Sequence, residues 1–267
     1  MTTSDAIQNE GSSRKRYATR AQRRLRSIFR RFGLDLFNRS GILFVQAVPE
    51  SLMGRQEHFQ ALQRLWITGN EKNRFDLARL FLLIANVEQT ERDGVEGAVA
   101  ELGVWKGNSA AILHALLPRR ELYLLDTFQG FDDRDVDERQ AEHEGTFADT
   151  SVDAVRSLIG DSPRIHFLHG RFPETALAIP EEVRFAFVHL DCDLYAPMRA
   201  GLEFFYRRMS PGGAILIHDY GSGGWPGVTR ACDEFSRSAG VRFVLLPDKS
   251  GSAMLVTPRP DPRVAPA

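Results

Sequence analysis

The segment from residue 97 to residue 126 constrains the fold of this chain more than any other stretch. It begins with GAVAELGVWKGNS, an apolar run that reaches a glycine-containing bend and enters a helix-forming stretch, and it ends with the apolar run ELYLLD. The order is therefore strand, glycine bend, helix, strand and acid, which is how an α/β sheet builds a nucleotide-type pocket. In such a pocket glycine lets the backbone approach the ligand closely, and the acid accepts hydrogen bonds from ribose hydroxyls.

The spacing of the glycines narrows the choice of ligand. The Gly-x-Gly-x-x-Gly pattern of dinucleotide-binding sheets is absent. Glu101 instead precedes Gly103 and Gly107, which fits a pocket for S-adenosylmethionine better, and Asp126 takes the place of the ribose-binding acid. For this motif taken alone, an ordinary strand–turn–helix with incidental glycines remains the alternative.

Apolar runs and helix-forming stretches alternate along the middle of the chain. Strands are expected near 98–102, 121–126, 164–168, 184–190 and 213–218, and helices near 108–117, 151–159, 195–208 and 227–238. Such alternation predicts a parallel sheet with helices on both faces. The runs VRFVLLP and AMLVTP, joined by PDKSGS, predict a closing antiparallel hairpin. Methyltransferase sheets end in this way, whereas a dinucleotide-binding sheet would continue parallel.

Composition divides the chain into three regions. Residues 1–60 form an N-terminal arm that is strongly basic up to about residue 40 and whose first dozen residues are expected to be disordered. An amphipathic helix is expected from Ala21, because apolar residues follow at helical spacing: Leu25, Ile28, Phe29 and Phe32. Residues 61–257 form the expected α/β domain, which opens with helical sequence up to residue 88, and the proline-rich tail 258–267 is expected to be flexible.

Two interpretations of the basic arm stay open. It could bind an anionic partner such as RNA, a lipid surface or an acidic carrier protein. It could instead be a solvated helix that packs against a sister subunit or covers the active site, and we favour this second interpretation. The whole chain has a net charge of −1, which argues against a nucleic-acid partner. A homo-oligomer, such as a homodimer, is the expected assembly.

Composition also indicates the compartment. The only cysteines, Cys192 and Cys232, show neither metal-ligand spacing nor a disulfide pattern, so a reducing, cytoplasmic setting is expected. The longest apolar run is far too short for a membrane span, and the arginine-rich N-terminus lacks the apolar segment of a secretory signal.

Acidic residues follow two successive predicted strands. FAFVHLDCDLYAP places Asp191 and Asp193 at a strand end, and GGAILIHDYG places His218 and Asp219 at the next. If the strands are neighbours, Asp191 and Asp219 converge in the crevice where open α/β sheets bind ligands. Because converging carboxylates repel, such an arrangement implies a cation, a shared proton or a basic partner. Oxygen-rich ligation suits magnesium.

The neighbours of these acids have less certain roles. His218 could be a third metal ligand, a general base near neutral pH or an ordinary hydrogen-bonded histidine, and imidazole is a poor ligand for magnesium. His189 is expected to be a packed core residue, and Cys192 a small buried one, because nothing near it activates a thiolate. The polar stretch 129–150 is long enough for a lid over the site, with a solvated acidic excursion as the alternative.

Together these motifs resemble the macrocin O-methyltransferase family, metal-dependent sugar methyltransferases of macrolide and aminocoumarin biosynthesis. The resemblance runs from about residue 60 to residue 245. It covers, in register, VAELGVWKGNSA, LLDTFQGF, GTFADTSVDAVR, HGRFPETA, HLDCDLYAPM, PGGAILIHDYG and PGVTRACDEF. It implies a class I methyltransferase fold (Rossmann-like α/β) with S-adenosylmethionine as cofactor.

The resemblance also assigns residues. It places six at the methionine end of the cofactor: Glu101, Gly103, Trp105, Gly107, Asn108 and Ser109. Asp126 would bind the ribose, and Asp191 would border the cofactor, bind magnesium and act as base. His218 and Asp219 would complete the metal site. The family commonly shows two aspartates before the tyrosine, however, and His218 replaces the first, which leaves the metal requirement open.

The function expected from this resemblance is S-adenosylmethionine-dependent O-methylation of a sugar or of a glycosylated small molecule, in natural-product tailoring or on a glycolipid, with assistance by a divalent metal. The alternatives are metal-independent transfer with His218 or Asp191 as base, a nicotinamide-dependent oxidoreductase, an RNA methyltransferase, and a non-catalytic module that binds through the arm.

Overall fold

The computed structural model describes residues 56–136, 146–246 and 248–259. The chain divides into two compact units, residues 1–60 and 61–267, and the second contains the sheet and the site discussed below. The expectations for the basic arm up to residue 55, for the middle of the acidic stretch and for most of the tail lie outside the described residues. In the part of the chain that is described, no helix is long and apolar enough to cross a membrane.

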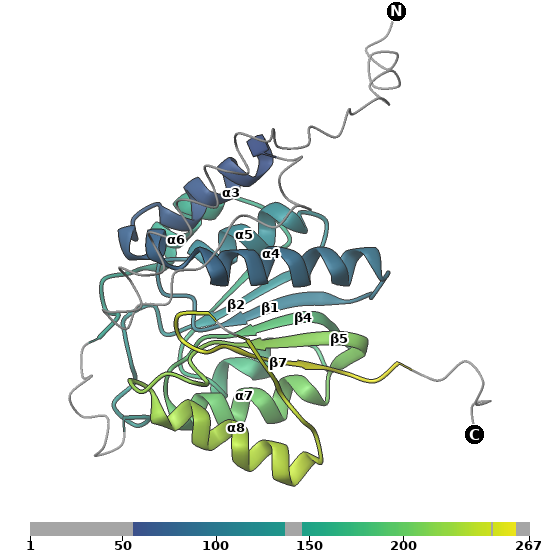
Figure 1. Cartoon of the computed structure of the whole chain (residues 1–267). Coiled ribbons are helices and arrows are strands. Elements are labelled where there is room, and N and C mark those ends of the chain that lie inside the picture. The colour runs from purple at the N-terminus through teal and green to yellow at the C-terminus, as the bar shows by residue number, and fades with distance from the viewer. Residues whose placement is uncertain (1–55, 137–145, 247, 260–267) are drawn as a thin grey trace, which may run out of the picture. The chain divides into compact units, whose positions relative to one another are not determined.

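A seven-stranded sheet forms the centre of the second unit, in the order β3-β2-β1-β4-β5-β7-β6 (Figure 1). The strands are β1 (Ala98–Leu102), β2 (Leu122–Asp126), β3 (Ile165–His169), β4 (Phe185–Leu190), β5 (Met209–Ile217), β6 (Val244–Leu245) and β7 (Ala253–Val256). β1 to β5 pair in parallel, whereas β7 is antiparallel to both β5 and β6. The predicted class I methyltransferase architecture, a parallel sheet closed by an antiparallel hairpin, is confirmed.

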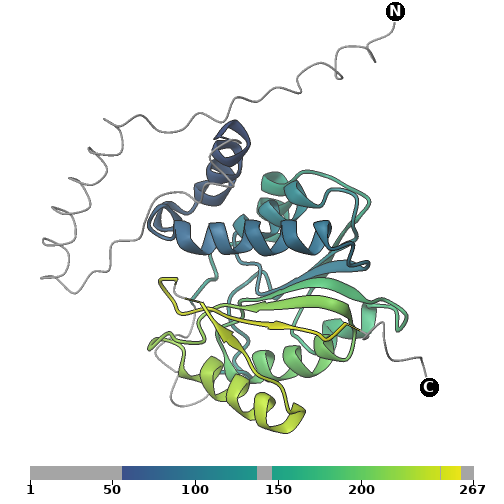
Figure 2. The same ribbon diagram turned by 45° about the vertical axis from the view of Figure 1, so that its right-hand side comes forward.

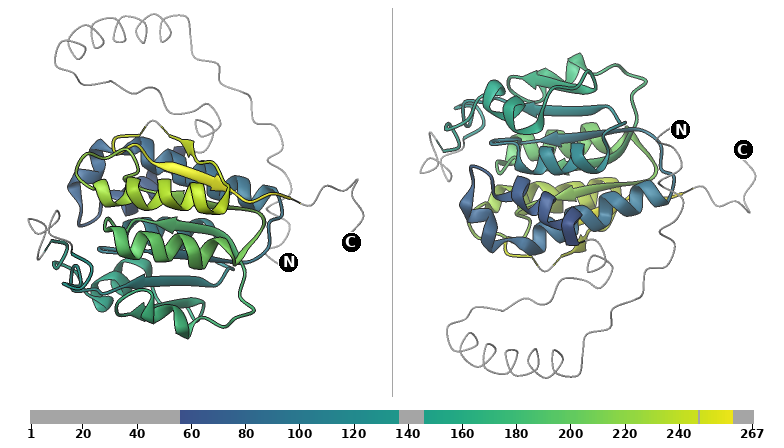
Figure 3. Two further views of the ribbon diagram at one scale, coloured as in Figure 1. Left: turned by 90° about the horizontal axis from the view of Figure 1, so that it is seen from below. Right: turned by 90° about the horizontal axis from the view of Figure 1, so that it is seen from above.

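Helices cover both faces of this sheet. The bounds are α4 (Leu77–Arg92), α5 (Asn108–Leu116), α6 (Val152–Ile159), α7 (Tyr195–Tyr206) and α8 (Pro226–Ala239). α4, α5 and α6 lie on one face, and α7 and α8 lie on the other (Figures 1 and 2). Figure 3 shows the α7–α8 layer from below and the α4 layer from above. Because both faces are covered, β1 and β4 are buried along their whole length, as parallel strands usually are.

The helical region expected over residues 60–88 is divided in two. α3 (Gln56–Ile67) ends before Gly69, whose left-handed φ of 68° terminates the helix. A 3₁₀ turn, η1 (Glu71–Phe75), then leads into α4. This break matters for function, because it brings the polar side chains of the turn and of the first turn of α4 to the wall of the cavity described below.

The register of the central strands brings their carboxyl ends to one edge. The backbone N–H of Gly103 donates to Leu125 O at 2.9 Å, Asp191 N–H donates to Leu102 O at 2.8 Å, and His218 N–H donates to Leu190 O at 2.9 Å. The residues just beyond β1, β4 and β5 are therefore fixed side by side. The strand order reverses between β1 and β4, and open α/β sheets bind their ligands at such a switch point.

Candidate active site

A cavity of about 470 Å³ opens at this edge of the sheet, within the range of roughly 300–1,000 Å³ that is typical of small-molecule sites. Its wall combines the ends of β1, β2, β4 and β5 with the η1–α4 segment and with the loops after β2 and β5. Of the residues predicted to bind cofactor or metal, eight line it: Gly103, Trp105, Asn108, Ser109, Asp126, Asp191, His218 and Asp219.

The glycine bend is packed tightly against its neighbours. Gly103 has a φ of +87°, and a Cβ atom there would lie 2.0 Å from the carbonyl oxygen of Asp191. Gly107 has a φ of +80°, and a Cβ atom would lie 2.6 Å from Cγ1 of Val155. Both positions therefore require glycine. These glycines were predicted to let a ligand approach. In the structure, Gly103 lets the end of β1 approach the end of β4, and Gly107 lets the start of α5 approach α6.

Asp126 braces this bend. Its Oδ2 accepts the backbone N–H groups of Val104 at 2.6 Å and Trp105 at 2.8 Å, and its Oδ1 accepts that of Phe128 at 2.7 Å. Trp105 and Phe128 have φ angles of +46° and +51°, a region that costs energy for residues other than glycine. The carboxylate thus holds two strained turns together. Its expected role at the ribose stays a prediction, next to this structural role that the sequence did not reveal.

Glu101 is fully buried and pairs with His189, whose Nδ1 lies 2.7 Å from Glu101 Oε1. The two face each other because β1 and β4 pair Glu101 with His189. Burial raises the pKa of Glu101, and the hydrogen bond to His189 opposes that shift. His189 is a satisfied core residue, as expected. Glu101 is not among the described residues that line the cavity, so its assignment to the cofactor stays a prediction.

Asn108 joins the cofactor end of the cavity to the end of α3. Its Nδ2 donates to the carbonyl oxygens of Leu65 and Thr68, both at 2.8 Å. These bonds use both protons of the amide group, which leaves its oxygen for other partners. The predicted contact of Asn108 with cofactor is therefore limited to the oxygen or the backbone.

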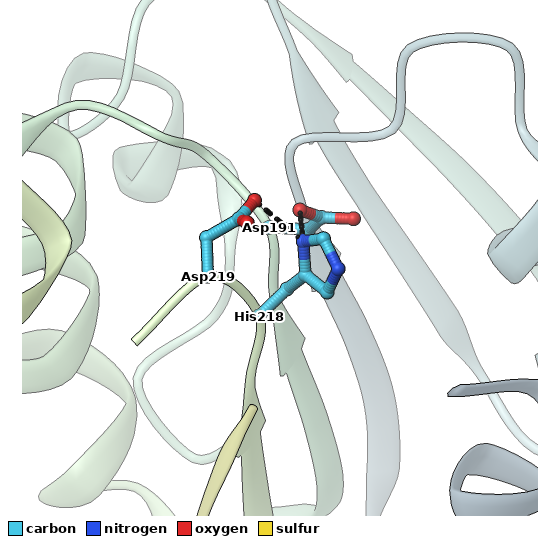
Figure 4. A group of neighbouring side chains, drawn as sticks. All are labelled: Asp191, His218 and Asp219. Carbon is cyan, nitrogen blue, oxygen red and sulfur yellow. Dashed lines mark ion pairs between the residues drawn. The ribbon is translucent and has the colours of Figure 1, made fainter. Parts of the chain in front are cut away.

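The acids beyond β4 and β5 converge on a histidine (Figure 4). Nδ1 of His218 lies 2.9 Å from Asp191 Oδ1 and 2.7 Å from Asp219 Oδ2. Both are ion-pair contacts. Nε2 of His218 is buried without a hydrogen-bond partner among the described residues. A buried polar atom without a partner beside a cavity fits a site that is completed by a ligand.

The charges in this cluster set its protonation. Burial lowers the pKa of His218, but the charge of Asp191 and the close contacts with the Asp191 and Asp219 carboxylates together outweigh burial and raise that pKa to about 10. Burial alone would raise the pKa of Asp191, but His218 and Arg79 hold it well below its usual value. Near neutral pH the cluster therefore contains an imidazolium beside an ionised Asp191.

Asp193 also belongs to this cluster. It is buried, lines the cavity and has a φ of +59°, while Asp219 has a φ of +61°. Burial raises the pKa of Asp193 well above its usual value, and the charges of Asp191 and Asp219 raise it further. Cys192, between the two acids, is buried and its thiol pKa is raised by that burial, which agrees with an inert residue.

The η1 turn and the start of α4 contribute polar residues to the site that were not predicted from the sequence. Arg79 Nη1 donates to Asp191 Oδ2 at 3.1 Å, and Arg79 Nε lies 3.3 Å from Asp76 Oδ2. Both residues line the cavity. The signal available in the sequence was NRFDLAR, a charged interruption in an otherwise apolar helical stretch. Nothing in its spacing says that it lies beside the end of β4.

Aromatic side chains form a second wall. Phe131 contacts Phe147 and Trp225, with ring centroids 5.4 and 5.6 Å apart, and Phe147 contacts Trp105 at 5.0 Å. The backbone after residue 145 is held to the glycine bend, because Asp149 accepts Trp105 Nε1–H at 2.8 Å and pairs with Lys106 at 2.7 Å. The described parts of the stretch 129–150 thus border the cavity, and its role as a lid stays a prediction.

A divalent ion fits the acid cluster poorly. One atom from each of Asp191, His218 and Asp219 lies within 4.8 Å of the others, close enough to share an ion. Both oxygens of Asp191, however, already face cationic groups of the chain, Arg79 and His218. Magnesium prefers six oxygen ligands in octahedral geometry, and an imidazole nitrogen is a poor ligand for it.

The sequence is similar to that of known sugar methyltransferases. A family model described as macrocin O-methyltransferase matches residues 73–246. The chain is 35% identical over 162 residues to the 8-demethyl-8-(2,3-dimethoxy-alpha-L-rhamnosyl)-tetracenomycin-C 4'-O-methyltransferase of Streptomyces olivaceus, covering 54% of this chain and 60% of that protein. It is 34% identical over 153 residues to the mycinamicin III 3''-O-methyltransferase of Micromonospora griseorubida, covering 50% and 59%. The chain thus spans about three fifths of the length of these curated relatives.

Solved structures share the fold. The O-methyltransferase NovP superposes with a TM-score of 0.60 at 23% identity, covering 68% of this chain and 80% of that one. The calicheamicin methyltransferase CalS11 superposes with a TM-score of 0.55 at 24% identity, covering 80% and 95%. At this level of identity the likeness extends to the architecture only.

Proposed function

Because the chain belongs to the macrocin O-methyltransferase family, we propose that it transfers a methyl group from S-adenosylmethionine to a hydroxyl group of a sugar or of a glycosylated small molecule. The observation that carries this proposal is the cavity at the switch point of the sheet, which joins a glycine bend to a charged cluster. The name of the Streptomyces olivaceus relative supports the acceptor class, because it describes an O-methyltransferase of a rhamnosyl-bearing tetracenomycin.

The bend between β1 and α5 is suited to the cofactor. The backbone from Gly103 to Trp105 is fixed by Asp126, and Ser109 at the start of α5 lines the same part of the cavity. Gly103, which has no side chain, presents only backbone atoms to the cavity. These residues would hold S-adenosylmethionine, which supplies the methyl group on a positively charged sulfur when bound.

The aromatic wall is suited to the acceptor. The faces of Phe131, Phe147 and Trp225 are negative, so they attract the polarised C–H bonds of a sugar ring or stack on an aromatic aglycone. Trp225 follows β5 and lies on the same loop as Asp219. An acceptor packed on this wall would therefore place a hydroxyl near Asp191 and His218. Orientation of the two reactants in this way can lower the barrier by roughly 7–11 kcal/mol.

Asp191 is the better proton acceptor of the two. In this arrangement His218 is an imidazolium, which has no free lone pair. A hydroxyl oxygen becomes strongly acidic as it gains a methyl group, so a carboxylate of low pKa is basic enough to take its proton late in the reaction. As the carbon–oxygen bond forms, the bond from the methyl carbon to the sulfur of the cofactor would break and leave a neutral thioether, while the O–H bond breaks and its proton moves to Asp191. A positioned base of this kind contributes typically about 10²–10⁴-fold.

Mass spectrometry of a panel of glycosylated acceptors tests this function. With S-adenosylmethionine present, we expect one acceptor class to gain a methyl group in place of a proton. Asp191→Asn removes the charge but little volume, so it should abolish turnover while cofactor binding, measured by calorimetry, persists. Wild-type turnover in Asp191→Asn would contradict the role of Asp191, and failure of the protein to bind S-adenosylmethionine would contradict the proposed function.

We also propose a cytoplasmic enzyme of natural-product tailoring that works as a homo-oligomer. Two free, buried cysteines agree with a reducing compartment. Size-exclusion chromatography with light scattering tests the oligomeric state, and a monomer at all concentrations would contradict it.

A further inference from the structure

Asp191 lies between the guanidinium group of Arg79 and the imidazole ring of His218. Its Oδ2 accepts a hydrogen bond from Arg79 Nη1 at 3.1 Å, and its Oδ1 lies 2.9 Å from His218 Nδ1. A divalent cation bound by the same oxygens would lie close to the guanidinium group of Arg79 and would be repelled by it. Arg79 cannot relieve this repulsion by losing a proton, since arginine stays charged at any physiological pH.

Arg79 is also fixed in this position. Its Nε faces Asp76 Oδ2 at 3.3 Å, its Nη2 donates to Asn73 Oδ1 at 3.4 Å, and its guanidinium lies 4.8 Å from the centre of the Trp66 ring. Only 15% of the side chain is exposed. A rotation of Arg79 away from Asp191 would therefore break three contacts at once.

Two of the residues that contact Arg79, Trp66 and Asn73, are joined to each other by two reciprocal hydrogen bonds. Trp66 Nε1–H donates to Asn73 O at 3.0 Å, and Asn73 Nδ2 donates to Trp66 O at 2.8 Å. Both residues are buried. The end of α3 and the η1 turn are thus fixed to each other, and together they hold the guanidinium group of Arg79 against the end of β4.

We propose that Arg79 takes the place of the divalent metal in this acceptor site, with His218 beside the other oxygen of Asp191, so that the enzyme keeps Asp191 ionised and oriented without a metal ion. Arg79 acts as a positioning residue, because it contacts Asp191 and works through it. This inference rests on the proposed O-methyltransferase function for its catalytic consequence, but its structural part, exclusion of a divalent cation, stands independently and can be measured without any acceptor.

Metal binding provides the first test. The full-length protein is freed of metal by chelation and dialysis, and Mn²⁺ is then titrated and followed by electron paramagnetic resonance. We expect no site of Asp191-dependent binding in the wild type or in Arg74→Gln, a control in η1 whose arginine, among the described residues, pairs with exposed Glu71 alone. The double variant Arg79→Gln with His218→Asp removes both groups that face the oxygens of Asp191 and places two aspartates side by side, so it should bind one equivalent.

Two results would overturn the inference. The first is stoichiometric Mn²⁺ binding by the wild-type protein that Asp191→Asn abolishes. The second is absence of binding in the double variant while its circular dichroism and melting temperature match the wild type. The single variants Arg79→Gln and His218→Asp show which of the two residues excludes the metal. They also keep the test possible if the double variant does not fold.

Turnover provides the second test, once the acceptor screen has identified a substrate. Wild-type activity should survive exhaustive chelation. Arg79→Gln should lower kcat roughly 10- to 100-fold, because misplacing the base removes part of the rate increase that a positioned base provides. KM for the cofactor should be unchanged. Arg79→Lys should recover much of the loss, because it keeps the charge. Loss of wild-type activity on chelation, with recovery on adding Mg²⁺, would refute the inference while leaving the methyltransferase function intact.

Discussion

Replacement of Asp126 by alanine tests the brace of the glycine bend. The substitution removes three hydrogen bonds from one carboxylate to the backbone N–H groups of Val104, Trp105 and Phe128, at 2.6 to 2.8 Å. A hydrogen bond to a charged group contributes about 1.5–3 kcal/mol. The sum of the three contributions is an upper bound on the loss of stability, because the bonds share one side chain and water can reach a site that is only partly buried.

With that reduction we expect Asp126→Ala to lower the free energy of unfolding by about 2–4 kcal/mol. The measurement is urea unfolding of the cofactor-free protein, with the slope of the transition unchanged. Asp133→Ala, at an exposed position in the following loop, is the matched control and should change stability by less than about 0.5 kcal/mol.

Calorimetry then separates the two roles of Asp126. If the carboxylate also binds the ribose, the folded variant should lose an additional 1–3 kcal/mol or so of affinity for S-adenosylmethionine. A stability loss no larger than that of Asp133→Ala would refute the brace. Unchanged cofactor affinity in a folded Asp126→Ala protein would refute the ribose assignment.

Three further predictions concern pH, the arm and the loop. The pKa of His218 is raised to about 10, so its contribution to stability is complete below its ordinary pKa of about 6.5 and is lost as the pH rises through 10. The free energy of unfolding, measured with urea from pH 6 to 10, should show this loss. The same measurement on His218→Gln should not show it. Deletion of residues 1–20 should leave cofactor binding intact in calorimetry, whereas steeply salt-dependent RNA binding that disappears on deletion would favour a phosphate-binding arm. Residues 129–150 should be cleaved more slowly by a protease when cofactor and acceptor are bound, and equal cleavage rates would indicate a solvated loop.

The sheet was predictable because its signal is local. Each parallel strand is a continuous apolar run, and the glycine bend and the hairpin turn mark where the runs begin and end. The convergence of Asp191 and Asp219 followed from one topological rule, that the carboxyl ends of neighbouring parallel strands meet. These features need no knowledge of how side chains from distant segments pack.

The contacts of the site were not predictable for the same reason. Arg79 reaches Asp191 across 112 positions of sequence, through a break between two helices that the periodicity of residues 60–88 did not reveal. Asp126 bonds to backbone N–H groups, which leave no trace in the choice of side chains. The position of His218 between two carboxylates depends on a rotamer, which only the packed structure defines.

Glu101 and His189 form a buried pair, so these two positions, which are distant in the sequence, are expected to change together. The side chains share one hydrogen bond in a region where both are almost inaccessible to water. Changing one residue would strand the other's polar atoms in the core, at a cost of about 3–5 kcal/mol if the pair is ionic, whereas an apolar pair of similar volume can be neutral. Substitutions should therefore accumulate here in pairs, and a library that varies Glu101 should vary His189 in the same clone.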